Sequence, residues 1–308
     1  MEKLTNSRIV ARQVCPMKEH LQYEERLRPL GIQWALSIGT AWHAGLEAYG
    51  QGADEETAVQ NGLETLEWIE STDPETQYKL ELEKCRVEVM IRQAIRRFKP
   101  RNMFAVEMEF DVPILNPMTG KKSRSFSLGG KADGVCEIDG ELWLLENKTT
   151  GLSLDQYREG YGLSNQLSLY LYAVSRALGK PLAGAIMRTI VKTRTEPKKS
   201  KGEIVETWDE YKQRLMELYD AEPERFVSED HVYRSSEELK QFEAELWSET
   251  QERLWQQKSG VIRRNTSACN NYGGCPFKAI CLNVPDAKET LYRVSTTTHD
   301  ELSSPETA

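Results

Sequence analysis

The chain has 308 residues, of which 39% are hydrophobic and 29% are charged, so it is long enough and apolar enough to fold around a packed core. Its net charge of −8 argues against a generally basic nucleic-acid-binding surface but is compatible with a local basic groove. No apolar run approaches the roughly 20 residues of a membrane-spanning helix, and the N-terminus lacks the apolar segment of a signal peptide, so we expect no membrane contact and a cytoplasmic location, in the host if the protein is viral.

The first hundred residues are expected to be mainly helical. One helix is predicted over residues 39–49, and a second over the following DEETAVQNGLETLEWIE stretch, which has acidic residues in its first turn. A longer amphipathic helix is predicted from Glu75 to Phe98, and Pro100 ends it.

The pattern then changes to three antiparallel strands. The stretch MFAVEMEFDVPIL alternates, and its Glu107 and Glu109 are interpreted as solvent-facing residues. A second strand, SFSLGGKADGVCEI, is joined to ELWLLENKT by the tight turn Asp139-Gly140. If that turn has two residues, Asp133 of the second strand lies directly opposite Glu146 of the third, with Cβ atoms about 4.5–5.5 Å apart.

The third strand ends in charged residues rather than in a turn signal. Strand side chains alternate, so Glu146 and Lys148 point to one face and Asn147 to the other. Adjacent carboxylates of Asp133 and Glu146 repel unless a cation lies between them, and carboxylate oxygens suit Mg²⁺ or Mn²⁺. The alternative is an ordinary surface ion pair on an edge strand, although the apolar run LWLL before it favours a central strand.

The rest of the chain adds one helix and one strand to this sheet and then becomes helical. We expect a helix over residues 165–178, a strand over 182–193, and helices over 210–219 and 236–256. A charged loop follows the strand. Such a run is usually a solvated loop, but beside a metal site its basic residues are predicted to contact a phosphate backbone. These residues are Lys192, Arg194, Lys198, Lys199 and Lys201.

The order of these motifs resembles the PD-(D/E)XK nuclease superfamily, and specifically its RecB-like exonuclease branch. The pattern G-x-x-D ending at Asp133 is followed by E-x-K and then by Q-x3-Y in a helix, at Gln166 and Tyr170. Upstream, His43 lies in the pattern G-x-x-x-H-x-x-L of the same branch.

The resemblance implies an α/β fold, a restriction-endonuclease-like central mixed sheet flanked by helices. It also implies that His43, Asp133, Glu146 and the backbone carbonyl of Asn147 hold Mg²⁺ or Mn²⁺. Lys148 would be the catalytic lysine, and Gln166 and Tyr170 would shape the site and its DNA contacts.

Four of the six cysteines form a second candidate metal site. Cys15 lies near the N-terminus, whereas Cys269, Cys275 and Cys281 form C-x5-C-x5-C near the C-terminus. Four thiolates suggest Zn²⁺ or a [4Fe–4S] cluster, and the x5 spacings favour the cluster over zinc. The arrangement resembles the iron–sulfur staple of AddB, of CRISPR-associated RecB-like exonucleases and of phage homologues. Cys85 and Cys136 are expected in the core.

The sequence therefore predicts a metal-dependent DNA nuclease, with exonuclease action favoured, in recombination, repair or DNA processing. Its substrates would be single strands or duplex ends. No Walker A motif is present, so a helicase or recombination partner would be a separate protein. Two alternatives stay open: a non-catalytic iron–sulfur or zinc module that binds DNA ends, and a recombination accessory protein with a structural zinc.

For the domain organisation, we expect a single nuclease domain over residues 1–284. It comprises a helical N-terminal part (1–100), a catalytic core (101–193) and a helical part with the cysteine cluster (194–284). The four-cysteine metal site would tie the N- and C-terminal parts together. Residues 285–308 are expected to form a flexible tail.

Overall fold

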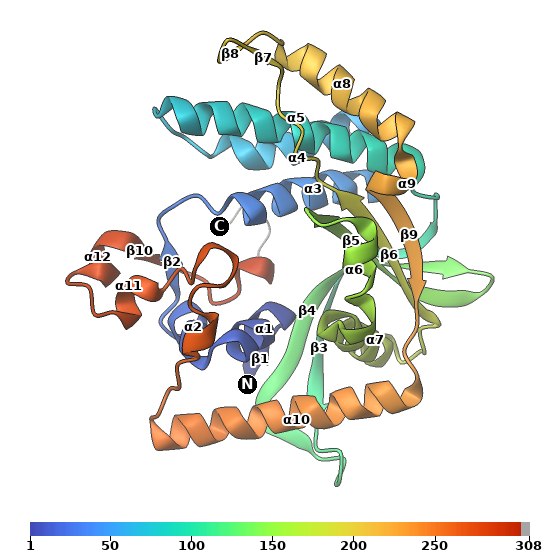
Figure 1. The fold of residues 1–308 in the computed structure, drawn as a ribbon. Coiled ribbons are helices and arrows are strands. Elements are labelled where there is room, and N and C mark those ends of the chain that lie inside the picture. Colours follow the sequence, from blue (N-terminus) through green and yellow to red (C-terminus); the bar gives the residue numbers. More distant parts are fainter. Residues whose placement is uncertain (303–308) are drawn as a thin grey trace.

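In the computed structural model, a six-stranded mixed sheet lies at the centre of the molecule with helices around it (Figure 1). The structure describes residues 1–302, except for the side chains of Tyr272 and Glu301. The order of strands is β1-β4-β5-β6-β9, with β3 on the other edge of β4. The strands span Glu2–Leu4 (β1), Asn102–Leu115 (β3), Lys122–Ile138 (β4), Glu141–Thr150 (β5), Gly184–Val191 (β6) and Val227–Val232 (β9).

The long strand β4 organises the sheet. Strand β3 pairs antiparallel along one edge of β4, from Lys122 to Glu137. The other edge is shared: β1 pairs parallel with Phe126–Leu128, and β5 pairs antiparallel with Gly134–Ile138. The stretch 129–133 of β4 therefore lies between two partners on that edge.

The turn that joins β4 to β5 has the predicted form. Asp139 and Gly140 both adopt positive φ, at 51° and 83°, as a two-residue hairpin turn of type I′ requires. Pairing from Ile138↔Glu141 to Gly134↔Leu145 keeps the predicted register. Strand β6 then adds parallel to β5, so the sheet is mixed.

The helices begin and end at residues whose chemistry favours those positions. Ser164 caps the start of α7, and Gly179 ends it in the left-handed conformation. The longer helices are α1 (Asn6–Val14), α3 (Trp34–Gly50), α4 (Glu55–Glu67), α5 (Pro74–Arg97), α7 (Asn165–Leu178), α8 (Trp208–Ala221) and α10 (Ser236–Ser259). Short ones are α2 (Pro16–Glu19), α6 (Leu154–Arg158), α9 (Pro223–Phe226), α11 (Lys278–Cys281) and α12 (Ala287–Leu291). None of the described helices is long and apolar enough to span a membrane.

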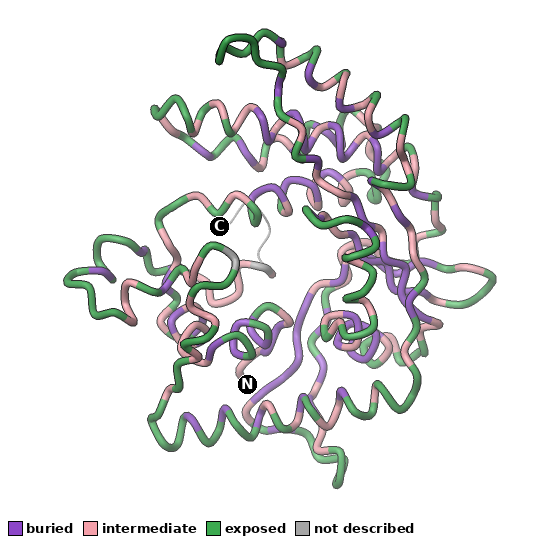
Figure 2. The backbone as a smooth tube through the Cα atoms, viewed as in Figure 1, coloured by how far each residue is buried: buried purple, intermediate pink, exposed green. Residues whose placement is uncertain are grey.

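Two hydrophobic cores hold these helices to the sheet. The first lies between the sheet and helices α7 and α10, with Leu144, Leu171 and Leu246 among its members. The second joins α3, α4, α5 and α8 and reaches the sheet at Ile190. Figure 2 shows the corresponding buried runs along the strands and along the inner sides of α3, α4 and α5.

The two ends of the chain meet in a buried cluster of charges. Glu19 is 1% exposed and lies 2.8 Å from Arg8, 3.1 Å from Arg12 and 3.2 Å from Arg253, measured between carboxylate oxygens and guanidinium nitrogens. The cluster therefore ties α1 and α2 to α10. Removal of one partner from a buried charge cluster leaves uncompensated charge, which is far more costly than loss of a surface pair.

The structure differs from the sequence-based expectation at both ends. Residues 2–4 form strand β1, and the polar segment 227–232 forms strand β9, neither of which the hydrophobic pattern indicated. Within the expected tail, α12 is followed by strand β10 (Tyr292–Val294), which pairs with β2 (Leu27–Pro29). These short strands are set by partners distant in sequence, which a local pattern does not reveal. Residues 303–308 lie outside the described part of the chain.

We predict that Glu19→Ala destabilises the protein by about 3–5 kcal/mol, because three buried arginines lose their shared counter-charge. The measurement is the urea midpoint of unfolding. The matched control is Glu56→Ala, since Glu56 also binds an arginine, Arg92, but its side chain is 78% exposed. The control should hardly move the midpoint. Equal, small shifts for both variants would contradict a stabilising role for the buried cluster.

Candidate active site

Asp133 and Glu146 lie one step beyond the last paired residues of β4 and β5. The ladder ends at Gly134↔Leu145, and the next position in the same register places Asp133 opposite Glu146. Beyond this point a side chain takes the place of a backbone acceptor between the two strands. The Asp133 Oδ2 accepts a hydrogen bond from the Asn147 N–H at 2.6 Å. Two carboxylates therefore converge where the hairpin opens.

The Glu146 carboxylate is almost completely buried, at 1% exposure. Its Oε1 accepts hydrogen bonds from Lys148 Nζ and from Gln166 Nε2, the latter at 3.0 Å. Its Oε2 is buried and has no hydrogen-bond partner among the described residues. Burial, and then repulsion from Asp133, raise the pKa of Glu146 from 4.5 to about 7.

His43 approaches the same pair from helix α3. Its Nδ1 lies 3.4 Å from Asp133 Oδ1. Burial alone would lower the pKa of His43, but the Asp133 carboxylate outweighs it and the pKa lies above its ordinary value. Burial would likewise raise the pKa of Asp133, but His43, Lys148 and the Asn147 N–H together lower it. His43 and Lys148 thus supply the positive charge that two adjacent carboxylates require.

Helix α7 covers the site from the other side. Gln166 binds Glu146, and Tyr170 lies one turn further along the helix, buried at 8% exposure. Burial, and then the charge of Glu146, raise the pKa of Tyr170. Asn147 belongs to the opposite face of β5 by strand alternation, and its buried Oδ1 has no hydrogen-bond partner in the described chain. The structure thus brings together His43, Asp133, Glu146, Lys148, Gln166 and Tyr170.

The donors at this point fit a hard divalent cation. Two carboxylates and an imidazole converge, and one buried carboxylate oxygen lacks a hydrogen-bond partner among residues 1–302 as described. In their present positions the side chains pair with one another. Accordingly, no group of three or more His, Cys, Asp or Glu side chains within the described residues has metal-ligand spacing.

Tyr157 is a residue near the site that the sequence did not indicate. It lies on the short helix α6. Burial is the main cause that raises its pKa; Lys148 lowers the pKa and Glu146 raises it further. The phenol is therefore within electrostatic reach of both residues. Its ring packs edge-on against Tyr161, with centroids 5.7 Å apart. Tyrosine in a short helix after a strand carries no motif, so no sequence signal was available.

The interpretation of Glu107 as a solvent-facing residue is wrong. Its side chain is 14% exposed, and its Oε2 lies 2.6 Å from Lys131 Nζ. Its φ of 49° is positive and changes the direction of the side chain. The prediction from alternation assumed a regular β backbone at this residue. Glu109 is exposed, as expected.

Only part of the predicted basic loop lies near the site. Lys192 donates its N–H to Thr150 O at 2.7 Å, and Arg194 donates to Gly151 O at 3.4 Å, so both flank the end of β5. Lys199 and Lys201, in contrast, belong to a hairpin of β7 (Lys199–Ser200) and β8 (Glu203–Ile204). That hairpin, with Lys198 just before it, lies beside α8, beyond helices α3 to α5 (Figure 1).

The four predicted cysteines lie in the same region, but they form no group with metal-ligand spacing among the described residues. The pKa of Cys281 is raised chiefly by burial and further by the thiols of Cys275, Cys15 and Cys269, which are therefore within electrostatic reach. The Asn265 N–H donates to Cys15 Sγ at 3.3 Å, and the Cys275 N–H donates to Cys269 O at 2.9 Å. The other two, Cys85 and Cys136, are buried in helix α5 and strand β4.

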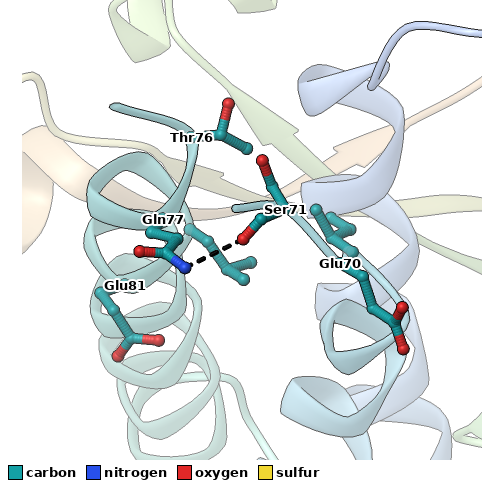
Figure 3. A pocket seen from close by; sticks show the side chains of 7 residues that line it. Glu70, Ser71, Thr76, Gln77 and Glu81 are labelled. Carbon is teal, nitrogen blue, oxygen red and sulfur yellow. Dashed lines mark hydrogen bonds between the residues drawn. The ribbon is translucent and has the colours of Figure 1, made fainter. Parts of the chain in front are cut away.

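A cavity of about 480 Å³ lies elsewhere, between the end of α4 and the start of α5. Figure 3 shows it lined by polar and acidic side chains, with Gln77 donating to Ser71 O at 2.9 Å. Its lining contains none of the candidate site residues. The cavity is therefore separate from the candidate site.

Comparisons with known proteins give one clear match. A family model described as "PD-(D/E)XK nuclease superfamily" matches residues 3–282. A solved structure titled "Crystal structure of SSO0001" matches with 14% identity over 77% of this chain and 82% of that chain, at a TM-score of 0.24, which is too low to support an argument. None of the curated proteins matches.

We predict that the affinity for Mn²⁺ rises with pH up to about 7. Below that value a proton on Glu146 competes with the ion, so the apparent dissociation constant increases about tenfold for each unit of falling pH. His43, whose pKa is also raised, should release a further proton.

Calorimetry in two buffers of different ionisation enthalpy measures the protons released. His43→Gln should release fewer protons than the wild type but retain the contribution of Glu146. An affinity that does not change between pH 5.5 and 7 would contradict a protonated, buried Glu146.

Proposed function

Because the chain belongs to the PD-(D/E)XK nuclease superfamily, we propose that it hydrolyses phosphodiester bonds in DNA with Mg²⁺ or Mn²⁺, ions that nucleases of this superfamily generally use. The observation that carries the proposal is the buried Oε2 of Glu146, which has no hydrogen-bond partner in the part of the chain that the structure describes and lies beside Asp133 and Lys148. We further propose the RecB-like branch, because His43 and the Gln166–Tyr170 pair converge on the same carboxylates.

Each side chain has a distinct role in this proposal. Asp133, Glu146, His43 and the carbonyl of Asn147 would hold the ion, whose chemistry is to stabilise charge on the phosphate and to acidify water. Lys148, on the same face as Glu146, would orient the attacking water. Gln166 would fix the orientation of Glu146, to which it is hydrogen-bonded.

We propose exonuclease action on single strands or duplex ends, in recombination, repair or DNA processing. Lys192 and Arg194, at the end of β5, would contact the DNA backbone near the site, and Lys198, Lys199 and Lys201 would contact it further along. Unwinding of duplex DNA would require a separate helicase. A single nuclease domain over residues 1–284 is part of the same proposal.

We predict that Lys148→Ala lowers the cleavage rate by about 10²–10⁴-fold, as expected for loss of a group that handles the attacking water. Asp133→Ala should abolish cleavage. Asn147→Ala should be far milder, since only its backbone carbonyl is assigned a role. The measurement uses end-labelled single- and double-stranded DNA with Mn²⁺, with linear and circular substrates in parallel.

The outcomes distinguish the proposed nuclease from a non-catalytic DNA-binding module. Cleavage that persists in Asp133→Ala and Lys148→Ala would contradict the site. Cleavage of circular DNA would contradict exonuclease action. Binding of DNA ends without cleavage by the metal-loaded wild type would instead favour a non-catalytic module on the same fold.

We also propose that Cys15, Cys269, Cys275 and Cys281 hold a [4Fe–4S] cluster, with zinc as the alternative. Support comes from Cys281, whose thiol is within electrostatic reach of the other three. The site would be structural, because it would join α2 to the segment after α10, next to the charge cluster around Glu19.

We predict that protein purified without oxygen is brown and contains about four iron atoms per chain. Cys281→Ala should remove the colour, whereas Cys85→Ala, a buried thiol on helix α5, should retain it. Metal analysis and visible absorption are the measurements. A colourless protein with stoichiometric zinc would replace the cluster with zinc, and a metal-free folded protein would contradict both.

A further inference from the structure

Glu107 has an unusual backbone conformation in the middle of a long strand. Its φ of 49° lies in the left-handed region that residues with side chains rarely adopt. The pairing of β3 with β4 nevertheless keeps one register on both sides, at Val106↔Gly134 and Met108↔Ala132, so Glu107 occupies the rung of Asp133. Such strain persists only where the surroundings impose it, and it is concentrated at functional sites.

The Glu107 carboxylate binds Lys131, at 2.6 Å between Oε2 and Nζ. Directly across from Lys131 in the ladder is Glu109, which is exposed. Lys131 therefore reaches diagonally to the strained residue rather than to the carboxylate opposite it. Both members of the pair are mostly shielded from water, at 14% and 26% exposure.

Lys131 is also close to the candidate metal ligands. It precedes Asp133 by two residues on β4 and so shares its face of the strand. The carboxylates of Asp133 and Glu47 attract its ammonium in addition to Glu107. Without the charge of Glu107, Asp133 and Glu47 would be among the carboxylates left to attract Lys131. An ammonium bound to Asp133 would compete with a divalent cation for the same oxygens.

We propose that Glu107 is a positioning residue that keeps Lys131 away from Asp133, so that Asp133 stays available to a divalent cation. The inference rests on the proposed function, since it requires Asp133 to bind a metal ion. It accounts for both the strained backbone of Glu107 and the diagonal ion pair. Glu107 touches neither substrate nor metal in this role and acts only through Lys131.

The test is a calorimetric titration of the full chain with Mn²⁺ alone, without DNA. Glu107→Gln should weaken Mn²⁺ binding about tenfold or more, because a neighbouring charge shifts the proton affinity of a carboxylate by about one to three powers of ten. Lys131→Met should bind Mn²⁺ at least as tightly as the wild type, because it removes the ammonium that could compete. The double variant should bind at least as tightly as the wild type, since the competing ammonium is gone.

The matched control is Glu109→Gln, which removes the same charge from the same strand, directly opposite Lys131 but not bound to it. It should leave the affinity unchanged. The inference is overturned if Glu107→Gln binds Mn²⁺ like the wild type, or equally weakly with and without Lys131. Lys131→Met tests it even if Glu107→Gln does not fold, because weaker binding would show that Lys131 is no competitor and would overturn it.

An Asp133→Asn arm separates this inference from the proposed function. If Asp133→Asn abolishes Mn²⁺ binding while Glu107→Gln has no effect, only the role of Glu107 fails. If Mn²⁺ binding is absent or does not depend on Asp133, the proposed site fails and the inference fails with it.

Discussion

The repulsion between two buried carboxylates is the constraint on which the site depends. Asp133 and Glu146 face each other where the hairpin of β4 and β5 opens, and neither can be ionised there without positive charge nearby. Three elements supply it or stabilise the pair by hydrogen bonds: α3 through His43, β5 through Lys148 and α7 through Gln166. A site of this kind is stable only if all these elements are packed in place, which links the catalytic chemistry directly to the fold.

The same constraint explains the arrangement around the free edge of β4. Strands β1 and β5 pair with separate parts of this edge, and the stretch 129–133 between them ends at Asp133. Strand β1 is kept there by the chain that follows it, since Arg8 and Arg12 of α1 are bound to the buried Glu19 and, through it, to Arg253 of α10. The charge cluster joins segments more than 200 residues apart and lies outside the carboxylate site.

Much of the core was predictable because its signals are local. The Asp139-Gly140 turn sets the loop length, and counting outward from it placed Asp133 opposite Glu146. The helix over 165–178 has its serine cap, Ser164, directly before it and its terminal glycine, Gly179, directly after it. Strands β1 and β9 were missed because their pairing partners are remote, and β9 is polar enough to resemble a loop. Glu107 was misinterpreted because alternation assumes regular backbone, and its φ is not regular.

The sequence by itself determined the identity and order of the candidate site residues and the register that joins two of them, because turn geometry and strand alternation are short-range properties. Only the tertiary structure decided that His43 reaches Asp133, that Tyr157 lies near Lys148, and that Lys131 binds Glu107 rather than Glu109. These contacts depend on how helices pack on the sheet and on one strained residue. Packing and strain are properties of the whole fold, and no local pattern encodes them.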